Sequence, residues 1–249
     1  MTTFAAVLEG LLRGDAGRPL VTFYDHASGE RTELSVTTYA NWVAKTAGLL
    51  ADEHDLERGQ ALRIDLPTHW LGPVFLGAAW SVGLAVTFGD DADAYVCGPD
   101  GLARWALQGT ERDAVVLASA LQPLGTRFAD PLPPGVHDYG VDVWSQPDAW
   151  VAFDPPGPLD VAVGSTTHEE LWAAAAAGDV LADGGRVLTE VNPASPSGLP
   201  SFTEPLVRGG SLVLVAHADP GRLEATYATE RATCSFPRGR GSSGVPDEA

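Results

Sequence analysis

The sequence predicts an α/β protein in which two layered lobes each carry a sheet covered by helices. Short apolar segments typical of strands alternate with helix-length segments along most of the 249 residues. A proline-rich stretch at 154–158 is a stiff connector, and we expect it to separate a first lobe at 1–153 from a second lobe at 159–236. The composition then changes to Arg, Gly, Ser and acidic residues, which predicts a disordered tail at 237–249.

The first lobe opens with a short helix followed by a hairpin. Apolar residues recur at helical spacing from Phe4 to Leu12, and two strand-like runs then flank a turn in which Gly29 can adopt the left-handed conformation. Ser35 or Thr37 can cap the next helix, whose apolar residues fall on one face. The further elements expected in this lobe are strands at 61–66, 83–88, 94–97, 114–118 and 136–144, and helices at 70–79 and 101–107.

The second lobe starts with a strand at 159–163, a Gly-Ser-Thr-Thr turn at 164–167 and a helix from His168.

The charge balance excludes several classes of partner. Thirty-three acidic and fifteen basic residues give a formal net charge of −18, which repels nucleic acids and anionic membrane surfaces. The basic residues are scattered singly, and Lys45 is the only lysine, interpreted as a solvated residue. We therefore expect no nucleic-acid or membrane partner. Arg63 and Arg186 are interpreted as surface residues.

The remaining composition favours a cytoplasmic protein. The N-terminal segment lacks the features of a secretory signal, and no apolar run is long enough to span a membrane. Cys97 and Cys234 lie in apolar surroundings without a second cysteine or histidine at ligand spacing, so we expect buried thiols and no metal site. The carboxylates of 90–93 are interpreted as solvated, and Trp42, Trp70 and Trp80 as core residues.

The turn at 164–168 is the candidate ligand site, because a helix that follows a strand presents free amides to an anion. Its candidate residues are Gly164, Ser165, Thr166, Thr167 and His168. A phosphate loop usually has several glycines and a lysine, and this turn has one glycine and no lysine. The alternative is that Ser165 or Thr166 caps the helix in a capping box with Glu169 or Glu170. A Ser165 nucleophile with His168 as base lacks the elbow motif, and we predict no catalytic residue.

The order and spacing of several short motifs resemble the adenylate-forming ligases, the superfamily of acyl-CoA synthetases and peptide-synthetase adenylation domains. In the first lobe the resemblance rests on four segments: Glu33-Leu-Ser35, Arg58-Gly-Gln-Ala-Leu62, Leu76-Gly-Ala-Ala-Trp80 and Gly83-Leu-Ala-Val86. In the second lobe Thr167-His168 and Leu171 are similar to the helix start that follows the family's phosphate loop. The segments 183–188 and 206–214 resemble a strand and a hairpin with its strand in the family, and the resemblance implies a helix at 219–230 and a last strand at 231–236.

This resemblance implies the N-terminal subdomains of a ligase, with the phosphate loop reduced and the C-terminal domain absent. It implies AMP, ATP or CoA as possible ligands, with no cofactor certain. We expect a degenerate, non-catalytic module that binds an acyl, nucleoside or adenylate-like ligand. The alternatives are an interaction or scaffold subunit, which forms an oligomer or docks on another enzyme, and one half of a split acyl-CoA ligase.

Overall fold

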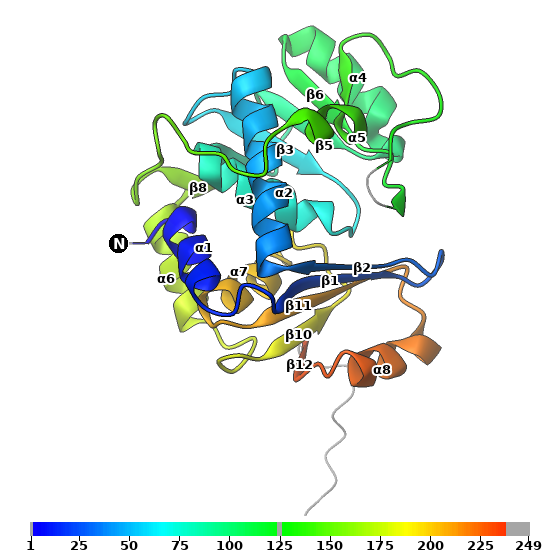
Figure 1. Ribbon diagram of the computed structural model, residues 1–249. Helices are drawn as coiled ribbons and strands as arrows, with labels where there is room; N and C mark the ends of the chain where they lie inside the picture. The colour runs from blue at the N-terminus through cyan, green and yellow to red at the C-terminus, as the bar shows by residue number, and fades with distance from the viewer. Residues whose placement is uncertain (1, 124–125, 238–249) are drawn as a thin grey trace, which may run out of the picture.

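The computed structural model describes residues 2–123 and 126–237 and confirms the predicted α/β fold (Figure 1). The predicted tail beyond residue 237 lies outside the described residues. The helices are α1 (Phe4–Arg13), α2 (Val36–Gly48), the π-helix η1 (Leu49–Glu53), α3 (Leu71–Val82), the 3₁₀ turn η2 (Pro99–Gly101), α4 (Leu102–Arg112), α5 (Tyr139–Asp142), the 3₁₀ turn η4 (Val143–Ser145), α6 (His168–Ala177), α7 (Pro200–Val207) and α8 (Pro220–Thr229). The strands are β1 (Pro19–Asp25), β2 (Arg31–Ser35), β3 (Ala61–Asp65), β4 (Ala85–Thr87), β5 (Ala94–Cys97), β6 (Val115–Ala118), β7 (Val136–Asp138), β8 (Val161–Val163), β9 (Thr166–Thr167), β10 (Arg186–Thr189), β11 (Ser211–Ala216) and β12 (Cys234–Phe236).

The strands form two sheets. The seven-stranded sheet has the order β7-β6-β5-β3-β4-β8-β9 and is parallel except for the β8–β9 pair. The five-stranded sheet has the order β12-β10-β11-β1-β2 and is parallel except for the β1–β2 hairpin. Both are thus mainly parallel sheets, in which the carboxyl ends of the strands share one edge.

The chain crosses between the sheets more than once. The N-terminal hairpin β1–β2 joins the five-stranded sheet, although it precedes the other strands of that sheet by most of the chain. Conversely, β8 and β9 follow the connector at 154–158 but extend the seven-stranded sheet. The sheets therefore do not follow the predicted division at this connector, and the division into two lobes stays a prediction.

Five layers stack in the order α8, five-stranded sheet, central helices, seven-stranded sheet and α4 (Figure 1). The side chains of β11 alternate between two of the resulting cores. Leu212 and Leu214 pack with the central helices, whereas Val213 and Val215 pack on the α8 side. Because both of its faces are covered, β11 is buried along its whole length.

Aromatic rings hold the central layer together. Trp80 of α3 is fully buried, and its ring lies 5.7 Å from Phe4 and 5.4 Å from Trp172, measured between centroids. Its Nε1 donates to the carbonyl of Ala162 at 3.0 Å, which ties α3 to β8. The expectation that Trp70 and Trp80 are core residues is confirmed, and Trp42 packs against the same core.

The structure corrects two predicted elements. The expected strand at 136–144 stops at Asp138, because this side chain accepts from the amide of Gly140 and caps α5. The segment before β11 is the helix α7 rather than a hairpin strand. In the sequence, Pro205 argues against a helix here, because proline inside a helix removes a backbone hydrogen bond. Pro200 is compatible with a helix, because the first helical residue needs no amide donor.

Three basic residues expected at the surface are instead largely covered. The side chains of Arg63, Arg186 and Lys45 are 17%, 14% and 17% exposed. Lys45 donates to the carbonyl of Gln146 and pairs with Asp148, since its long stem lets the charge reach acceptors while the methylenes pack. Of the two cysteines, Cys97 is buried as expected and Cys234 is half-buried.

Candidate functional site

A two-residue turn stands where the candidate ligand loop was predicted. Gly164 and Ser165 connect β8 to β9, and Val163 pairs with Thr166 in antiparallel register. Gly164 has a φ of +60°, the left-handed conformation that such hairpin turns require. The turn is too short to surround a phosphate group, because its backbone folds straight back on the preceding strand.

The backbone amides at the start of α6 already have acceptors. The amides of His168 and Glu169 donate to the carbonyls of Asp160 and Pro158 at 3.0 and 2.8 Å. The amide of Glu170 donates to Thr167 Oγ1 at 3.3 Å, and Glu170 Oε2 accepts from the amide of Thr167 at 2.9 Å. A capping box is therefore present, formed by Thr167 rather than by Ser165 or Thr166. An anion at this helix end would have to displace these bonds.

His168 faces the core. Its ring is fully buried, and neither ring nitrogen has a hydrogen-bond partner among the described residues. Burial lowers the pKa of His168, with the nearby Asp160 acting in the opposite direction. Ser165, in contrast, is exposed. The five candidate residues are consecutive in the chain, but their side chains do not face one common site. Ser165 faces solvent, and His168 faces the interior.

The described basic residues make no contact with this turn. Within the described parts of the chain, no hydrogen bond or ion pair joins an arginine or Lys45 to residues 164–168. Arg58, which contacts the preceding segment, is paired with Asp154 at 2.9 Å and with Asp160 at 3.2 Å. Its charge is therefore balanced by one carboxylate of the connector and one just before β8.

Sequence and structure comparisons place the chain among known proteins. A "TIGR03089 family protein" of Mycobacterium tuberculosis is 39% identical over 247 residues, which cover 93% of this chain and 97% of that protein. The chain belongs to the TIGR03089 family. No model of a known protein family matches the chain.

The fold of this TIGR03089 family member is that of the N-terminal part of the adenylate-forming ligases, as the sequence predicts. An acyl-CoA synthetase of Brucella canis superposes with a TM-score of 0.76 at 18% identity, over 94% of this chain and 47% of that enzyme. An anthranilate CoA ligase solved with anthranoyl-AMP superposes with a TM-score of 0.74 at 12% identity, over 93% of this chain and 49% of that enzyme. The chain thus spans about half the length of the solved ligases that it resembles.

The carboxyl edges of the two sheets meet at the segment that follows β3. Asn192, after β10, donates from Nδ2 to the carbonyl of Leu66 at 2.8 Å. Thr68 Oγ1 lies 3.4 Å from the carbonyl of Glu190. The two sheets are therefore held together at the edge where open α/β sheets bind their ligands.

His69 lies at this junction and was missed in the sequence. It is 4% exposed and packs its ring against Phe23 of β1, with 4.9 Å between ring centroids. Nδ1 accepts from the amide of Leu71 at 3.3 Å, so Nε2 carries the proton of the neutral ring and has no partner among the described residues. Burial lowers the pKa of His69 to about 4, partly offset by the charge of Asp25.

A second group of polar residues follows β1 and β11 at the same edge of the five-stranded sheet. His217 Nδ1 lies 2.8 Å from Asp25 Oδ1. Burial opposes ionisation of Asp25, but hydrogen bonds from His217, Ser28 and the amide of Ala27 outweigh it and lower its pKa. His26 accepts from the amide of Asp219 and contacts Thr226 Oγ1 at 3.1 Å, which anchors the start of α8.

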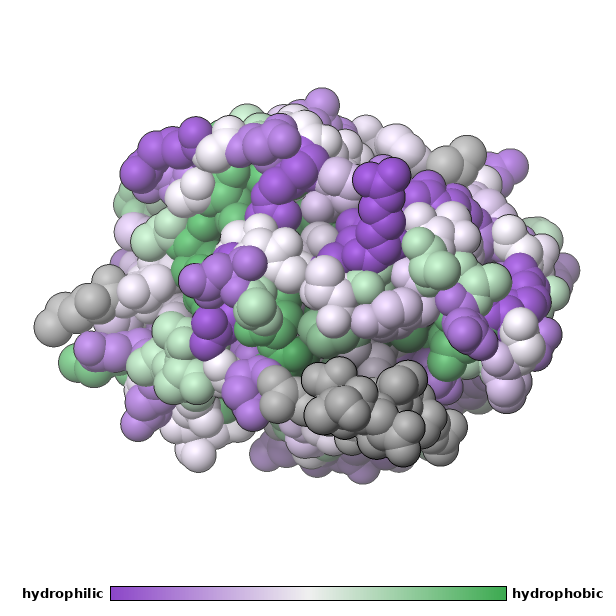
Figure 2. All heavy atoms as spheres, turned by 90° about the horizontal axis from the view of Figure 1, so that it is seen from below, coloured by the Kyte–Doolittle hydropathy of each residue, from purple (hydrophilic) through white to green (hydrophobic). Residues whose placement is uncertain are grey.

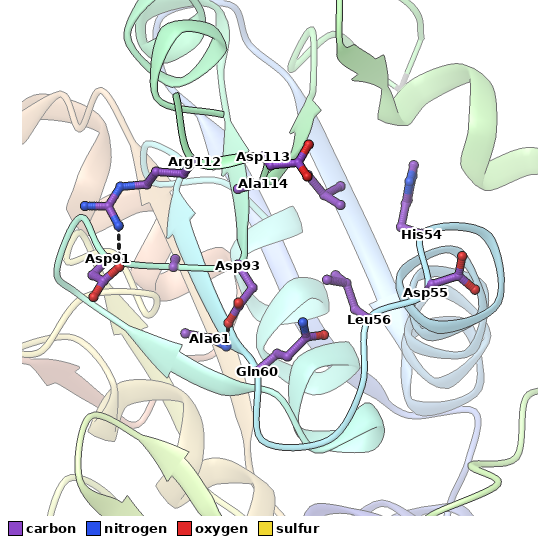
Figure 3. Close-up of a pocket in the computed structure, with 12 residues that line it drawn as sticks. His54, Asp55, Leu56, Gln60, Ala61, Asp91, Asp93, Arg112, Asp113 and Ala114 are labelled. Atoms are coloured by element: carbon purple, nitrogen blue, oxygen red, sulfur yellow. Dashed lines mark hydrogen bonds and ion pairs between the residues drawn. The ribbon is translucent and has the colours of Figure 1, made fainter. Parts of the chain in front are cut away.

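A polar pocket lies at the opposite, amino edge of the seven-stranded sheet (Figure 3). It is bordered by residues at the starts of β3, β5 and β6 and by His54. Two of its carboxylates have partners: Asp91 pairs with Arg112, and Asp93 accepts from the amide of Ala61 at 2.7 Å. Asp90, Asp91 and Asp93 are exposed, as expected for solvated carboxylates.

An apolar groove runs between α1, α6 and α7. Its lining includes Val7, Leu11, Trp172 and Leu206. Figure 2 shows apolar atoms gathered in a hollow on the side of the molecule where these helices lie in Figure 1. Neither this groove nor the pocket of Figure 3 is lined by residues 164–168.

Of the helices in the described ranges, none has the length and apolar character needed to traverse a bilayer.

Proposed function

We propose that this chain is a ligase-like domain that binds an acyl, nucleoside or adenylate-like ligand without activating it. The single observation that carries this proposal is the two-residue turn at Gly164 and Ser165, with the following helix amides already hydrogen-bonded. A ligase that joins a carboxylate to ATP must hold several negative charges together at the phosphates. Cationic and amide donors at that place contribute much of the transition-state stabilisation.

The charge of the chain supports the loss of this chemistry. Among the described residues, Arg58 is the basic residue whose contacts lie closest in sequence to the turn, and both of its partners are carboxylates, Asp154 and Asp160. With a formal net charge of −18, the surface does not attract a triphosphate. A ligand with one negative charge, such as a carboxylic acid, faces less repulsion than ATP.

We place the ligand at the junction of the two carboxyl edges, beside His69. A buried donor without a partner costs free energy, and a carboxylate or carbonyl oxygen would satisfy the Nε2 proton of His69. The rings of Phe23 and Trp70 that pack against His69 are buried as well, so a ligand reaches this donor only when the junction opens.

Two measurements on the full chain test this function. Thermal-shift and calorimetric titrations with AMP, ATP, CoA and a panel of carboxylic acids should find at least one ligand. ATP–pyrophosphate exchange with the same acids should find no turnover. His69→Phe, which keeps a ring but removes the donor, should weaken binding about threefold to tenfold, the value of one hydrogen bond. His217→Gln, at an exposed histidine, is the matched control.

Clear exchange activity would contradict the loss of adenylation. Absence of binding across the whole panel would contradict the binding module.

An interaction subunit is the second candidate, and one specific observation favours it. The segment between α5 and β8 exposes large apolar side chains: Trp144, Val151, Phe153 and Leu159 are 55%, 88%, 105% and 77% exposed. Exposed apolar residues at this density often mark protein contacts. Light scattering should then find an oligomer, and Phe153→Ser should reduce it. A monomer at all concentrations without a co-purifying partner would contradict this candidate.

A further inference from the structure

Two histidines and an aspartate from three separate segments come together at the edge of the seven-stranded sheet. They are His54, directly after the π-helix η1, His137 of β7 and Asp142 of α5. One ligand atom from each lies within 4.8 Å of the other two. The rings of His54 and His137 are 4.4 Å apart between centroids. Nothing in the sequence spacing predicts this cluster, because His54 and His137 are far apart in the chain.

We propose that His54, His137 and Asp142 bind a divalent transition-metal ion, with Zn²⁺ as the best fit. Imidazole nitrogens and a carboxylate are the ligand types that Zn²⁺ prefers in proteins, and three protein ligands leave a position for water. Hard cations such as Mg²⁺ and Ca²⁺ prefer sets made of oxygen alone. This proposal is independent of the proposed binding function and lies at a different edge of the molecule.

The contacts of His54 leave one of its ring nitrogens without a partner among the described residues. Its Nε2 is buried and has no hydrogen-bond partner among the described residues. Figure 3 places its ring at one end of the pocket, turned away from Asp93 and Gln60. A bound cation would give the ring the partner that it lacks.

Carboxylates surround His54. Burial and the neighbouring His137 lower its pKa, whereas Asp142, Glu53 and Asp55 act in the opposite direction. The surrounding carboxylates add a negative potential that attracts a cation.

The backbone fixes the three ligands in place. His54 follows a five-residue π-helix, a feature found often at functional sites, and its amide donates to the carbonyl of Leu49 at 3.2 Å. Asp138 caps α5 and so sets the position of Asp142 relative to His137. His137 is exposed, which gives an ion a path from solvent.

The test is metal titration of the full chain after dialysis against a chelator. We expect one equivalent of Zn²⁺ to bind by calorimetry and to raise the unfolding temperature, since an ion that binds only the native state stabilises it. Co²⁺ should give the visible absorption bands of a site with nitrogen ligands, and Mg²⁺ should not compete. His54→Gln, His137→Gln and Asp142→Asn should each weaken Zn²⁺ binding by at least about tenfold.

His217→Gln is the matched control, because His217 is also an exposed histidine paired with a carboxylate. It should leave Zn²⁺ binding unchanged. His137 is exposed, so His137→Gln keeps the fold and its result is decisive even if His54→Gln unfolds the chain. The proposal is overturned if the parent protein binds no Zn²⁺, or if His137→Gln binds it with the affinity of the parent.

Discussion

Arg186 and Glu230 form an ion pair 2.5 Å long on the five-stranded sheet, with side chains that are 14% and 7% exposed. The two residues join β10 to the end of α8. Glu230 also accepts from Tyr24 Oη at 2.5 Å and from Arg31 Nε at 3.0 Å, so one carboxylate links β1, β2, β10 and α8. Arg186 in turn donates to Thr22 Oγ1 at 2.8 Å. This network fastens the outer helix to the sheet.

Glu230→Ala should lower the free energy of unfolding by about 3 kcal/mol, because it leaves the largely covered charge of Arg186 without its partner. Chemical denaturation of both proteins measures the difference. Glu224→Ala, an exposed change on the same helix, should stay within about 0.5 kcal/mol of the parent. Equal stability of Glu230→Ala and the parent would mean that the network contributes nothing.

The same carboxylate makes the stability depend on pH in the acid range. Burial disfavours the charged form of Glu230, but hydrogen bonds from Tyr24, Arg186 and Arg31 outweigh it and lower the pKa. Its contribution is therefore complete above the unfolded-state pKa of about 4.3 and is lost as the pH falls through the lower, folded-state pKa. The stability difference between parent and Glu230→Gln should be constant from pH 7 to pH 5 and shrink below about pH 4. A difference that grows at low pH would contradict this.

Most of the fold is predictable because its strands and helices differ in local pattern. The alternation of strands and helices and the hairpin at β1–β2 follow from periodicity and turn residues. The sheet assignment does not follow, because β1 pairs with β11 through contacts that span most of the chain. Local pattern carries no information on such a pairing.

The turn at Gly164 and Ser165 was predictable in position but not in geometry, and its role as a ligand site stays a prediction. The glycine of the turn and the capping box with Glu170 can be inferred from residue types. The short strand β9 could not be inferred, because two residues are too few to show the alternation of apolar and polar side chains that marks a strand. His69 was missed for a different reason: its burial depends on Phe23, which belongs to the other sheet.

Replacement of glycine by alanine should have opposite effects on stability at Gly77 and at Gly10. A Cβ at Gly77 in α3 would lie 2.2 Å from Tyr39 Oη and 2.8 Å from Val43 Cγ2, whereas a Cβ at Gly10 in α1 meets nothing within 4 Å. Gly77→Ala should therefore destabilise the fold by about 1–3 kcal/mol through overpacking. Gly10→Ala should stabilise it by up to about 1 kcal/mol, since alanine favours the helix. Thermal unfolding of the two variants decides this, and shifts of the same sign would contradict the packing argument.

Thr167 stabilises the start of α6 through its side chain. Thr167→Ala removes the acceptor for the amide of Glu170 and should cost about 1 kcal/mol of unfolding free energy. Thr167→Ser keeps the hydroxyl and should cost much less. Urea denaturation of the two variants gives the comparison. If both lose the same stability, the methyl group rather than the cap is responsible.

His69 should remain neutral far below the usual range of histidine. Burial lowers its folded-state pKa to about 4, against about 6.5 in an unfolded chain. Between these values only the unfolded state takes up the proton, so this histidine's contribution is complete above about pH 6.5 and is lost as the pH falls towards 4. Over the full range the loss is on the order of 3 kcal/mol. An NMR titration, with the resonance assigned through His69→Gln, should show an unchanged His69 ring at pH 5.5 in the folded protein. The same ring should titrate near pH 6.5 in urea. Titration near pH 6.5 in the folded protein would mean that water reaches the ring, which would contradict the burial of His69 in the ligand-free protein.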